Sequence, residues 1–199
     1  PDGRLSLARQ FQELWCSETD SSSWTVATEG KTVYVSTGND GNVYRYRNQK
    51  MELFFDAPQV AIFSLLPLKD GSVLAGAAPD GIVYRVDKQG NGTVFCRTSA
   101  HYIWEMIEEP DGNILLATGL PAQIVRIDSR GQVIKTFQLT AVHARTMTVG
   151  PRGDIWIGTA STGRIYHFKG NDVQLVHDSF ASEISCLCCD STGVWFATV

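Results

Sequence analysis

Apolar and polar residues alternate along this chain in short runs, and turn residues separate the runs every 8–12 positions. Residues 33–37 and 73–77, for example, are apolar or small, and each run leads through a Gly-containing turn into a second alternating run. A period of two residues is typical of β-strands with one face on a core. No segment longer than a turn has the 3.6-residue period of a helix. The pattern predicts an all-β protein.

The same pattern recurs at a nearly constant interval. Residues 33–47 (VYVSTGNDGNVYRYR) align with residues 73–87 (VLAGAAPDGIVYRVD), and residues 114–128 and 155–169 are two further copies. A fifth copy begins at Val194, so the starts lie 40, 41, 41 and 39 residues apart. Such a period is typical of repeat proteins in which each unit is one small sheet.

Each copy predicts four strands. An apolar first strand leads into a turn, and the second strand ends in small residues such as Gly76 and Gly158. A second Gly hairpin, a third strand with a cation at one position and an outer strand complete the unit. The first turns share a glycine: Gly30-Lys31, Asp70-Gly71, Asp111-Gly112, Arg152-Gly153 and Thr192-Gly193. Glycine there fits a hairpin that needs positive φ.

Four short strands in a 40-residue period predict the blade of a β-propeller. Stacking such sheets around an axis, first strand innermost, buries faces that a single sheet would leave in water. We expect a single domain over residues 1–199 with complete four-stranded blades at 22–56, 62–96, 102–138 and 143–177.

The two termini predict half-blades, at residues 1–16 and 183–199, which gives about five blade-equivalents. Joined head to tail, the two halves would complete one blade in register. Two interpretations stay open: a segment of a six- to eight-bladed propeller, or five blade-equivalents closed by a composite blade. Because the chain begins at Pro1 without a methionine, we favour the segment.

The repeats resemble a known group of propellers. The run GPRGDIWIGT (150–159) is similar to the signature of two-component-regulator propellers, and YIWEMIEEPDGNILLATG with the following IVRID is similar to bacterial propellers. The units thus resemble degenerate bacterial repeats of the NHL, YVTN and two-component-regulator type. The Gly-His and Trp-Asp dipeptides of standard WD40 repeats are absent. The resemblance implies a WD40-like fold but not one function, because propellers host sensors, adaptors, lyases and lactonases alike.

The composition of the chain limits the classes of binding partner that we expect. The net charge of -4 gives no electrostatic reason to expect nucleic acid or an anionic membrane surface. No apolar run approaches the roughly 18 residues that membrane insertion needs. Five cysteines include Cys186, Cys188 and Cys189. Neither a disulfide framework nor a zinc site is indicated by their spacing, and we interpret this segment as a buried innermost strand.

Candidate binding residues lie where the repeats differ at one structural position. At the start of the innermost strand the copies carry Ser21, Ala61, Tyr102, His143 and Glu183. Two residues later they carry Ser23, Phe63, Trp104, Arg145 and Ser185. In a propeller these positions converge at one mouth of the central channel, on the face where the loops after the second strands open.

The aromatic and charged members of this set predict a ligand-binding patch: Tyr102, Trp104, Glu105, His143, Arg145 and Glu183. The alternative is that Phe63 and Trp104 only fill space between blades. No motif for a catalytic nucleophile, phosphate loop or metalloprotease occurs, and we expect no cofactor and no bound metal.

We therefore favour a non-enzymatic binding scaffold whose partner is a protein or small-molecule ligand at the mouth. The alternative is a metal-dependent enzyme of the lactonase or streptogramin-lyase kind, which would need a divalent metal held by Glu105, His143 and Glu183. A structural spacer without ligands is a third possibility.

Overall fold

The structure is a computed structural model that describes Glu13 and residues 22–199. Strands in the described part of the chain number 18, and no helix occurs there. It follows that no described segment is a helix able to cross a membrane. The first two blades contain β1 (Ser23–Glu29), β2 (Thr32–Thr37), β3 (Asn42–Arg47), β4 (Lys50–Asp56), β5 (Ala61–Pro67), β6 (Val73–Ala78), β7 (Ile82–Val86) and β8 (Gly92–Arg97).

The next blades repeat this plan. Each of the four complete blades is antiparallel with its strands in chain order, and β17 pairs with β18 alone. Blades three and four and the final hairpin contain β9 (Tyr102–Glu108), β10 (Ile114–Gly119), β11 (Gln123–Ile127), β12 (Val133–Gln138), β13 (His143–Val149), β14 (Ile155–Ala160), β15 (Arg164–Lys169), β16 (Asp172–Asp178), β17 (Ile184–Cys189) and β18 (Val194–Thr198).

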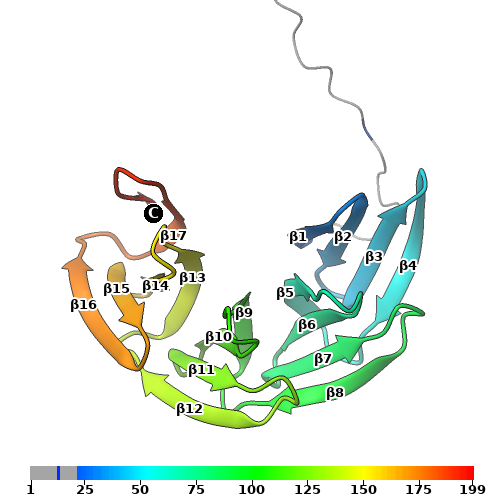
Figure 1. The fold of residues 1–199 in the computed structure, drawn as a ribbon, viewed down its shortest axis with the longest axis horizontal. Helices are drawn as coiled ribbons and strands as arrows, with labels where there is room; N and C mark the ends of the chain where they lie inside the picture. The colour runs from blue at the N-terminus through cyan, green and yellow to red at the C-terminus, as the bar shows by residue number, and fades with distance from the viewer. Residues whose placement is uncertain (1–12, 14–21) are drawn as a thin grey trace, which may run out of the picture.

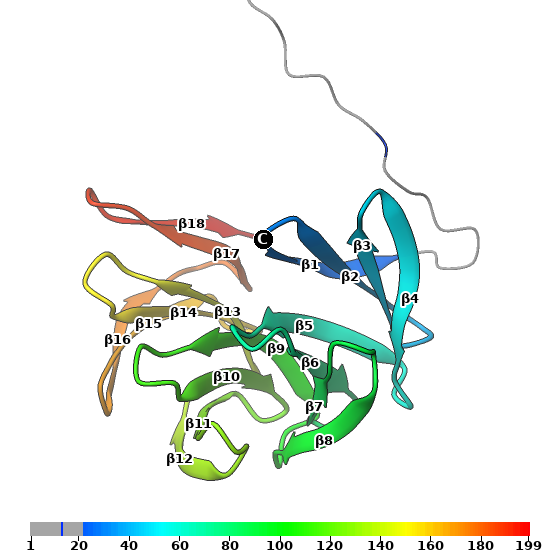
Figure 2. The same cartoon turned by 45° about the vertical axis from the view of Figure 1, so that its right-hand side comes forward.

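The blades follow one another around an open arc (Figure 1). The strands β1, β5, β9, β13 and β17 line its inner side, while β4, β8, β12 and β16 form its outer side. Figure 2 shows the β17–β18 hairpin and the β1–β4 blade as the two ends of the arc. The predicted all-β propeller fold, with the first strand of each blade innermost, is confirmed. The half-blade predicted at residues 1–16 lies outside the described residues, apart from Glu13.

Neighbouring blades touch through backbone pairs at one end of the inner strands. Gly119 pairs with His143, which links the third and fourth blades into one eight-stranded sheet. The isolated bridges Gly38–Ala61 and Ala160–Glu183 make the same contact at two other junctions. At these three junctions the end of the second strand therefore lies beside the start of the next blade's first strand, where the sequence predicts the mouth of the channel.

Arginine side chains of the third strands form hydrogen bonds to the next blade. Arg45 binds the Glu52 carboxylate and also donates to the Lys88 carbonyl of the next blade at 2.8 Å. Arg126 likewise binds Glu109 and donates to the Gly170 carbonyl of the following blade at 2.7 Å. At Arg45 and Arg126, the guanidinium group therefore reaches a backbone carbonyl of the next blade, as expected for a side chain that packs between blades.

The cysteine-rich strand differs from its prediction. Cys186 and Cys188 of β17 are exposed, whereas Ile184 and Leu187 are buried against the fourth blade. The two thiols alternate to the opposite face, and no described strand packs there. The expectation of a buried innermost strand is therefore wrong for Cys186 and Cys188. Cys16 lies outside the described residues.

Gly153 tests the turn geometry, because its φ is +76° and an added Cβ would meet nothing within 4 Å. Gly153→Val is therefore expected to cost about 1–2 kcal/mol of unfolding free energy through backbone strain alone. Gly193 occupies the corresponding turn of β17–β18, is equally open and lacks positive φ. Gly193→Val should stay within about 0.5 kcal/mol of the parent in urea unfolding. Equal losses in the two variants would contradict a strain origin.

Candidate functional site

Every inner strand carries a β-bulge at the same place. The strand register shifts once near the start of each, so that one extra residue is left unpaired. A bulge redirects the side chain of the extra residue and is common at binding sites. The bulged residues are Trp24, Phe63, Trp104, Arg145 and Ser185.

The first blade departs from the predicted alignment by one residue. Sequence spacing assigned Ser23 to the position of Phe63 and Trp104, but the register places Trp24 there. The corresponding earlier position is Ser22, whose carbonyl accepts from the Gly38 amide at 3.1 Å; Ser21 lies outside the described residues. The position predicted to be a serine is therefore an indole, which enlarges the aromatic part of the mouth.

The five bulges open into one pocket on the inner side of the arc, with a volume of about 280 Å³. We call it the axial pocket. Its walls also include Glu105 from β9 and Thr146 from β13, and residues from all five inner strands contribute. Of its aromatic residues, Trp24 has 48% of its surface exposed, so its ring is available to a ligand. The complete lining is Trp24, Thr25, Val26, Phe63, Ser64, Leu65, Trp104, Glu105, Met106, Arg145, Thr146 and Ser185.

Aromatic rings form a continuous row across three blades. The Phe63 ring lies between two indoles, with ring centroids 4.6 Å from both Trp24 and Trp104. Tyr102 stacks on Trp104 at 4.9 Å with the ring planes only 4° apart. Such edge-to-face and stacked pairs are favourable beyond the area they bury. The row is thus a rigid apolar wall of the pocket.

A charged wall faces the end of this row. The Arg145 guanidinium carbon lies 4.6 Å from the centre of a Trp104 ring, a cation–π contact. Its Nε lies 3.4 Å from a Glu183 carboxylate oxygen, and about a third of each side chain is exposed, 35% and 32%. Arg145 is therefore held over the indole by a loose ion pair.

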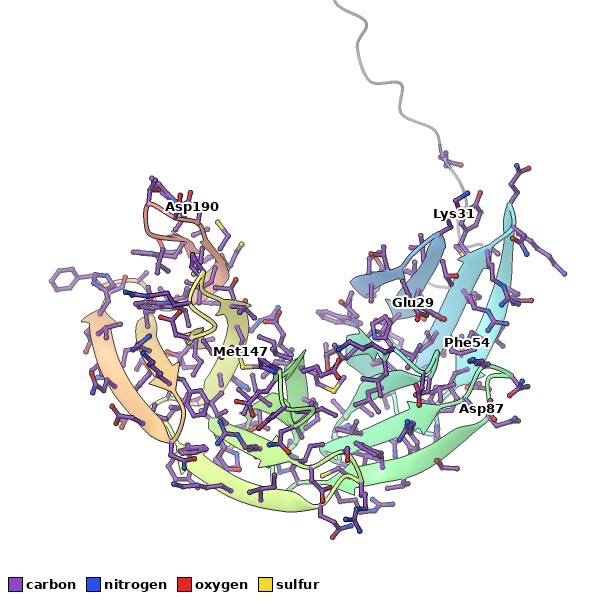
Figure 3. The ribbon with its side chains drawn as sticks, in the orientation of Figure 1. Glu29, Lys31, Phe54, Asp87, Met147 and Asp190 are labelled. Carbon is purple, nitrogen blue, oxygen red and sulfur yellow. The ribbon has the colours of Figure 1, made fainter. Side chains whose placement is uncertain are left out.

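Glu105 is the partly buried acid of the site. One of its carboxylate oxygens accepts a 2.5 Å hydrogen bond from the Met147 amide of the next blade; Figure 3 shows Met147 among the inner strands. Burial raises the pKa of the Glu105 carboxyl above its ordinary value, although the Met147 amide, the Thr146 side chain and Arg145 pull it down. Its proton affinity is thus raised inside the pocket.

His143 is held as a neutral imidazole. Trp104 Nε1 donates to His143 Nδ1 at 3.0 Å, which requires that Nδ1 carry no proton. Burial lowers the pKa of His143, and the nearby Arg145 lowers it further. The neutral ring therefore has its proton on Nε2, and neither nitrogen offers a free lone pair.

Five of the six predicted patch residues form a chain of contacts: Tyr102, Trp104 and His143 are in mutual ring contact, and Arg145 joins Trp104 to Glu183. Of the six, Trp104, Glu105 and Arg145 line the axial pocket, whereas Tyr102, His143 and Glu183 are not part of its lining. The three acids and bases proposed as metal ligands are each already engaged. Glu105 binds Met147, His143 binds Trp104 and Glu183 pairs with Arg145. Among the described residues, no group of three His, Cys, Asp or Glu side chains is placed to hold a metal ion.

The substitution Glu105→Gln tests how the raised pKa of this carboxyl group affects stability. Because the folded-state pKa is raised above its ordinary 4.5, the parent loses stability as pH rises through that interval, and the loss persists at higher pH. A glutamine oxygen can still accept from the Met147 amide without a charge. The variant should therefore unfold at a higher urea concentration than the parent at pH 8, with the difference shrinking at pH 4. A less stable variant at pH 8 would show that the ionised carboxylate is favoured in the fold.

Sequence comparisons do not assign a family: no protein-family model matches, and no curated protein matches. Solved structures do match, and those described below share 14–17% of their residues with this chain. A streptogramin B lyase structure superposes with a TM-score of 0.78 at 14% identity over 94% of this chain. The chain spans 65% of the length of that lyase.

Propellers from other classes of protein are also among the structural neighbours. The extracellular domain of a hybrid two-component system from B. thetaiotaomicron matches with a TM-score of 0.72 at 17% identity, over 92% of this chain and 27% of that one. The WD40 β-propeller domain of Doa1 matches with a TM-score of 0.71 at 14% identity, over 87% of this chain and 59% of that one. These likenesses show the propeller fold, which a lyase, a WD40 domain and an extracellular domain of a two-component system share.

Proposed function

We propose that this chain is a propeller binding module that takes an apolar group of a protein or small-molecule ligand into the axial pocket. The observation that carries the proposal is the set of bulges, because all five inner strands direct a side chain into one place. Concave pockets with aromatic walls and a few polar groups are typical ligand sites.

The aromatic row favours binding over mere packing. A ring that only filled space between blades would be covered on both faces, yet Trp24 is half-exposed and Phe63 and Trp104 line a pocket. Rigid aromatic side chains supply contact area at small entropic cost, as at the energetic centres of interfaces. The nidogen–laminin complex contains a structural neighbour of this chain, with a TM-score of 0.64 at 15% identity, and that neighbour is part of a protein–protein complex.

The test is a fragment screen by ligand-observed NMR on the parent and on Phe63→Leu. This substitution keeps an apolar side chain but removes the ring between Trp24 and Trp104. Phe180→Leu is the matched control, because Phe180 is fully exposed and lies outside the pocket lining. We expect fragments that bind the parent and the control but lose affinity for Phe63→Leu. A screen in which the two variants behave alike would reject the axial pocket as the site.

The enzyme alternative is favoured by one observation, the structural match to the lyase. It requires a divalent metal near Glu105, His143 and Glu183, and their present partners would have to be displaced. Calorimetry with calcium, magnesium and manganese separates the two functions. Metal binding that Glu183→Gln abolishes would support the enzyme.

A further inference from the structure

The axial pocket contains N–H donors of Arg145 that are available to a ligand. A guanidinium has five N–H donors in a planar fork. In the described part of the chain, Arg145 has a single ionic partner, Glu183, at 3.4 Å, which exceeds the usual hydrogen-bond length of 2.7–3.2 Å. Buried or half-buried arginines with well-made pairs look different: Arg126 holds Glu109 at 2.6 and 2.8 Å.

The orientation of Arg145 is nevertheless fixed. Its guanidinium lies against Trp104, and Trp104 is held by the bond from its Nε1 to His143 and by stacking with Tyr102. An oriented fork with open donors matches a carboxylate, which can take two parallel hydrogen bonds. Ser185 and Thr146 also line the pocket. Their hydroxyl groups already have partners, because Ser185 Oγ donates to the Ala197 carbonyl at 3.3 Å and the Thr146 side chain bonds to Glu105.

The apolar wall lies in the same pocket as these donors. The half-exposed Trp24 and the adjoining Phe63 can stack with a planar ring, while Arg145 lies beyond Trp104 along the row. A ligand that reaches both must carry a ring and an anionic group a few bonds apart. Aliphatic anions would leave the rings uncovered. A cation placed at the guanidinium would meet the Arg145 charge, while the other charged group of the lining, Glu105, already accepts from the Met147 amide.

Building on the proposed function, we propose that the axial pocket recognises an aromatic carboxylic acid, either a small arylacetate or the C-terminal aromatic residue of a peptide. The ring stacks on Trp24 and Phe63, and the carboxylate accepts from the Arg145 guanidinium. Glu183 is the internal competitor, because its carboxylate pairs with Arg145 when the pocket holds no anion and is displaced by the ligand.

Calorimetry with three indoles of nearly equal size tests the charge preference: indole-3-acetate, neutral indole-3-acetamide and cationic tryptamine. We expect the acetate to bind about tenfold tighter than the other two, as one charge-assisted bidentate pair allows. Arg145→Gln should remove that preference, so that the acetate and the acetamide bind with similar affinity. Glu183→Gln should tighten acetate binding several-fold, and by more than it changes acetamide binding.

Equal binding of all three indoles, or a preference that survives in Arg145→Gln, would overturn this inference and leave the binding module intact. Absence of binding for every indole together with a fragment screen insensitive to Phe63→Leu would overturn both. The dipeptide acetyl-Ala-Trp as free acid and as amide distinguishes the sources. A peptide source requires the acid to bind more tightly than both the amide and indole-3-acetate, whereas a small arylacetate requires indole-3-acetate to bind best.

Discussion

Replacing Gly158 by leucine is expected to lower the free energy of unfolding by about 1–3 kcal/mol, or more if the blades cannot separate. A Cβ atom at this position would lie 2.7 Å from Ile184 Cγ2 and 2.9 Å from Thr146 Cγ2, and Ile184 is fully buried. The rest of a leucine side chain would force the half-blade away from the fourth blade. Urea unfolding followed by circular dichroism measures the loss, and a parental midpoint would show that β14 does not pack as described.

A double-mutant cycle tests whether crowding between residue 158 and Ile184 causes this loss of stability. In the corresponding places of the third and fourth blades, Ala117 and Ala144 share one buried cluster instead of a Gly–Ile pair. Gly158→Ala and Ile184→Ala should each destabilise, while the double variant recreates the Ala–Ala pair. We expect the double variant to be more stable than the sum of the single losses predicts. Simple additivity would mean that the two residues do not compete for the same volume.

Arg126→Ala is expected to cost about 3–5 kcal/mol, because it removes one partner of a buried ion pair. The side chains of Arg126 and Glu109 are only 12% and 16% exposed. The substitution leaves the Glu109 carboxylate without its two hydrogen bonds and removes the clasp on the Gly170 carbonyl of the fourth blade. Thermal and urea unfolding would show the loss.

Arg85→Ala is the matched control, since Arg85 occupies the same third-strand position one blade earlier. Its partner Asp70 and its own side chain are 53% and 35% exposed. An exposed pair contributes about 0–1 kcal/mol, so this variant should remain close to the parent. Similar losses for Arg85→Ala and Arg126→Ala would show that burial of the pair does not set its contribution.

The repeat period predicted the fold because each strand is short and its neighbours in sequence are its neighbours in space. Strands β9–β12 span residues 102–138, as expected, and the expected bounds of the other complete blades differ from those of their strands by at most one residue at either end. Small residues such as Gly158 marked the crowded contacts between blades, and turn glycines such as Gly153 marked positive φ.

The alignment of the first blade failed by one residue for a local reason. Four residues, 29–32, separate Thr28 and its strand partner Val33, whereas five, 68–72, separate Pro67 and Val73. A constant spacing counted back from the second strand therefore selected Ser23 instead of Trp24. The shorter Gly30-Lys31 hairpin was the signal that could have corrected it.

The positions of the β-bulges and the distances within ion pairs could not be predicted from the sequence. Alternation indicates which face of a strand a residue occupies, but an unpaired extra residue changes the face after it without changing composition. The sequence therefore brought together Trp104, Arg145 and Glu183 but could not show that Arg145 keeps open donors. Nor could it show that β17 exposes Cys186 and Cys188, since that depends on which strands pack beside it.

In the proposed function, the bulged aromatic residues of the inner strands form one binding site. The most direct measurement is an NMR titration of protein with ¹⁵N-labelled tryptophan, using indole-3-acetate as the ligand. Trp156 and Trp195 lie at the other end of the β14 and β18 strands and serve as internal references. We expect the indole N–H signals of Trp24 and Trp104 to shift with one common saturation curve while those of Trp156 and Trp195 stay in place. Shifts confined to the reference tryptophans, or none at saturating ligand, would contradict the claim.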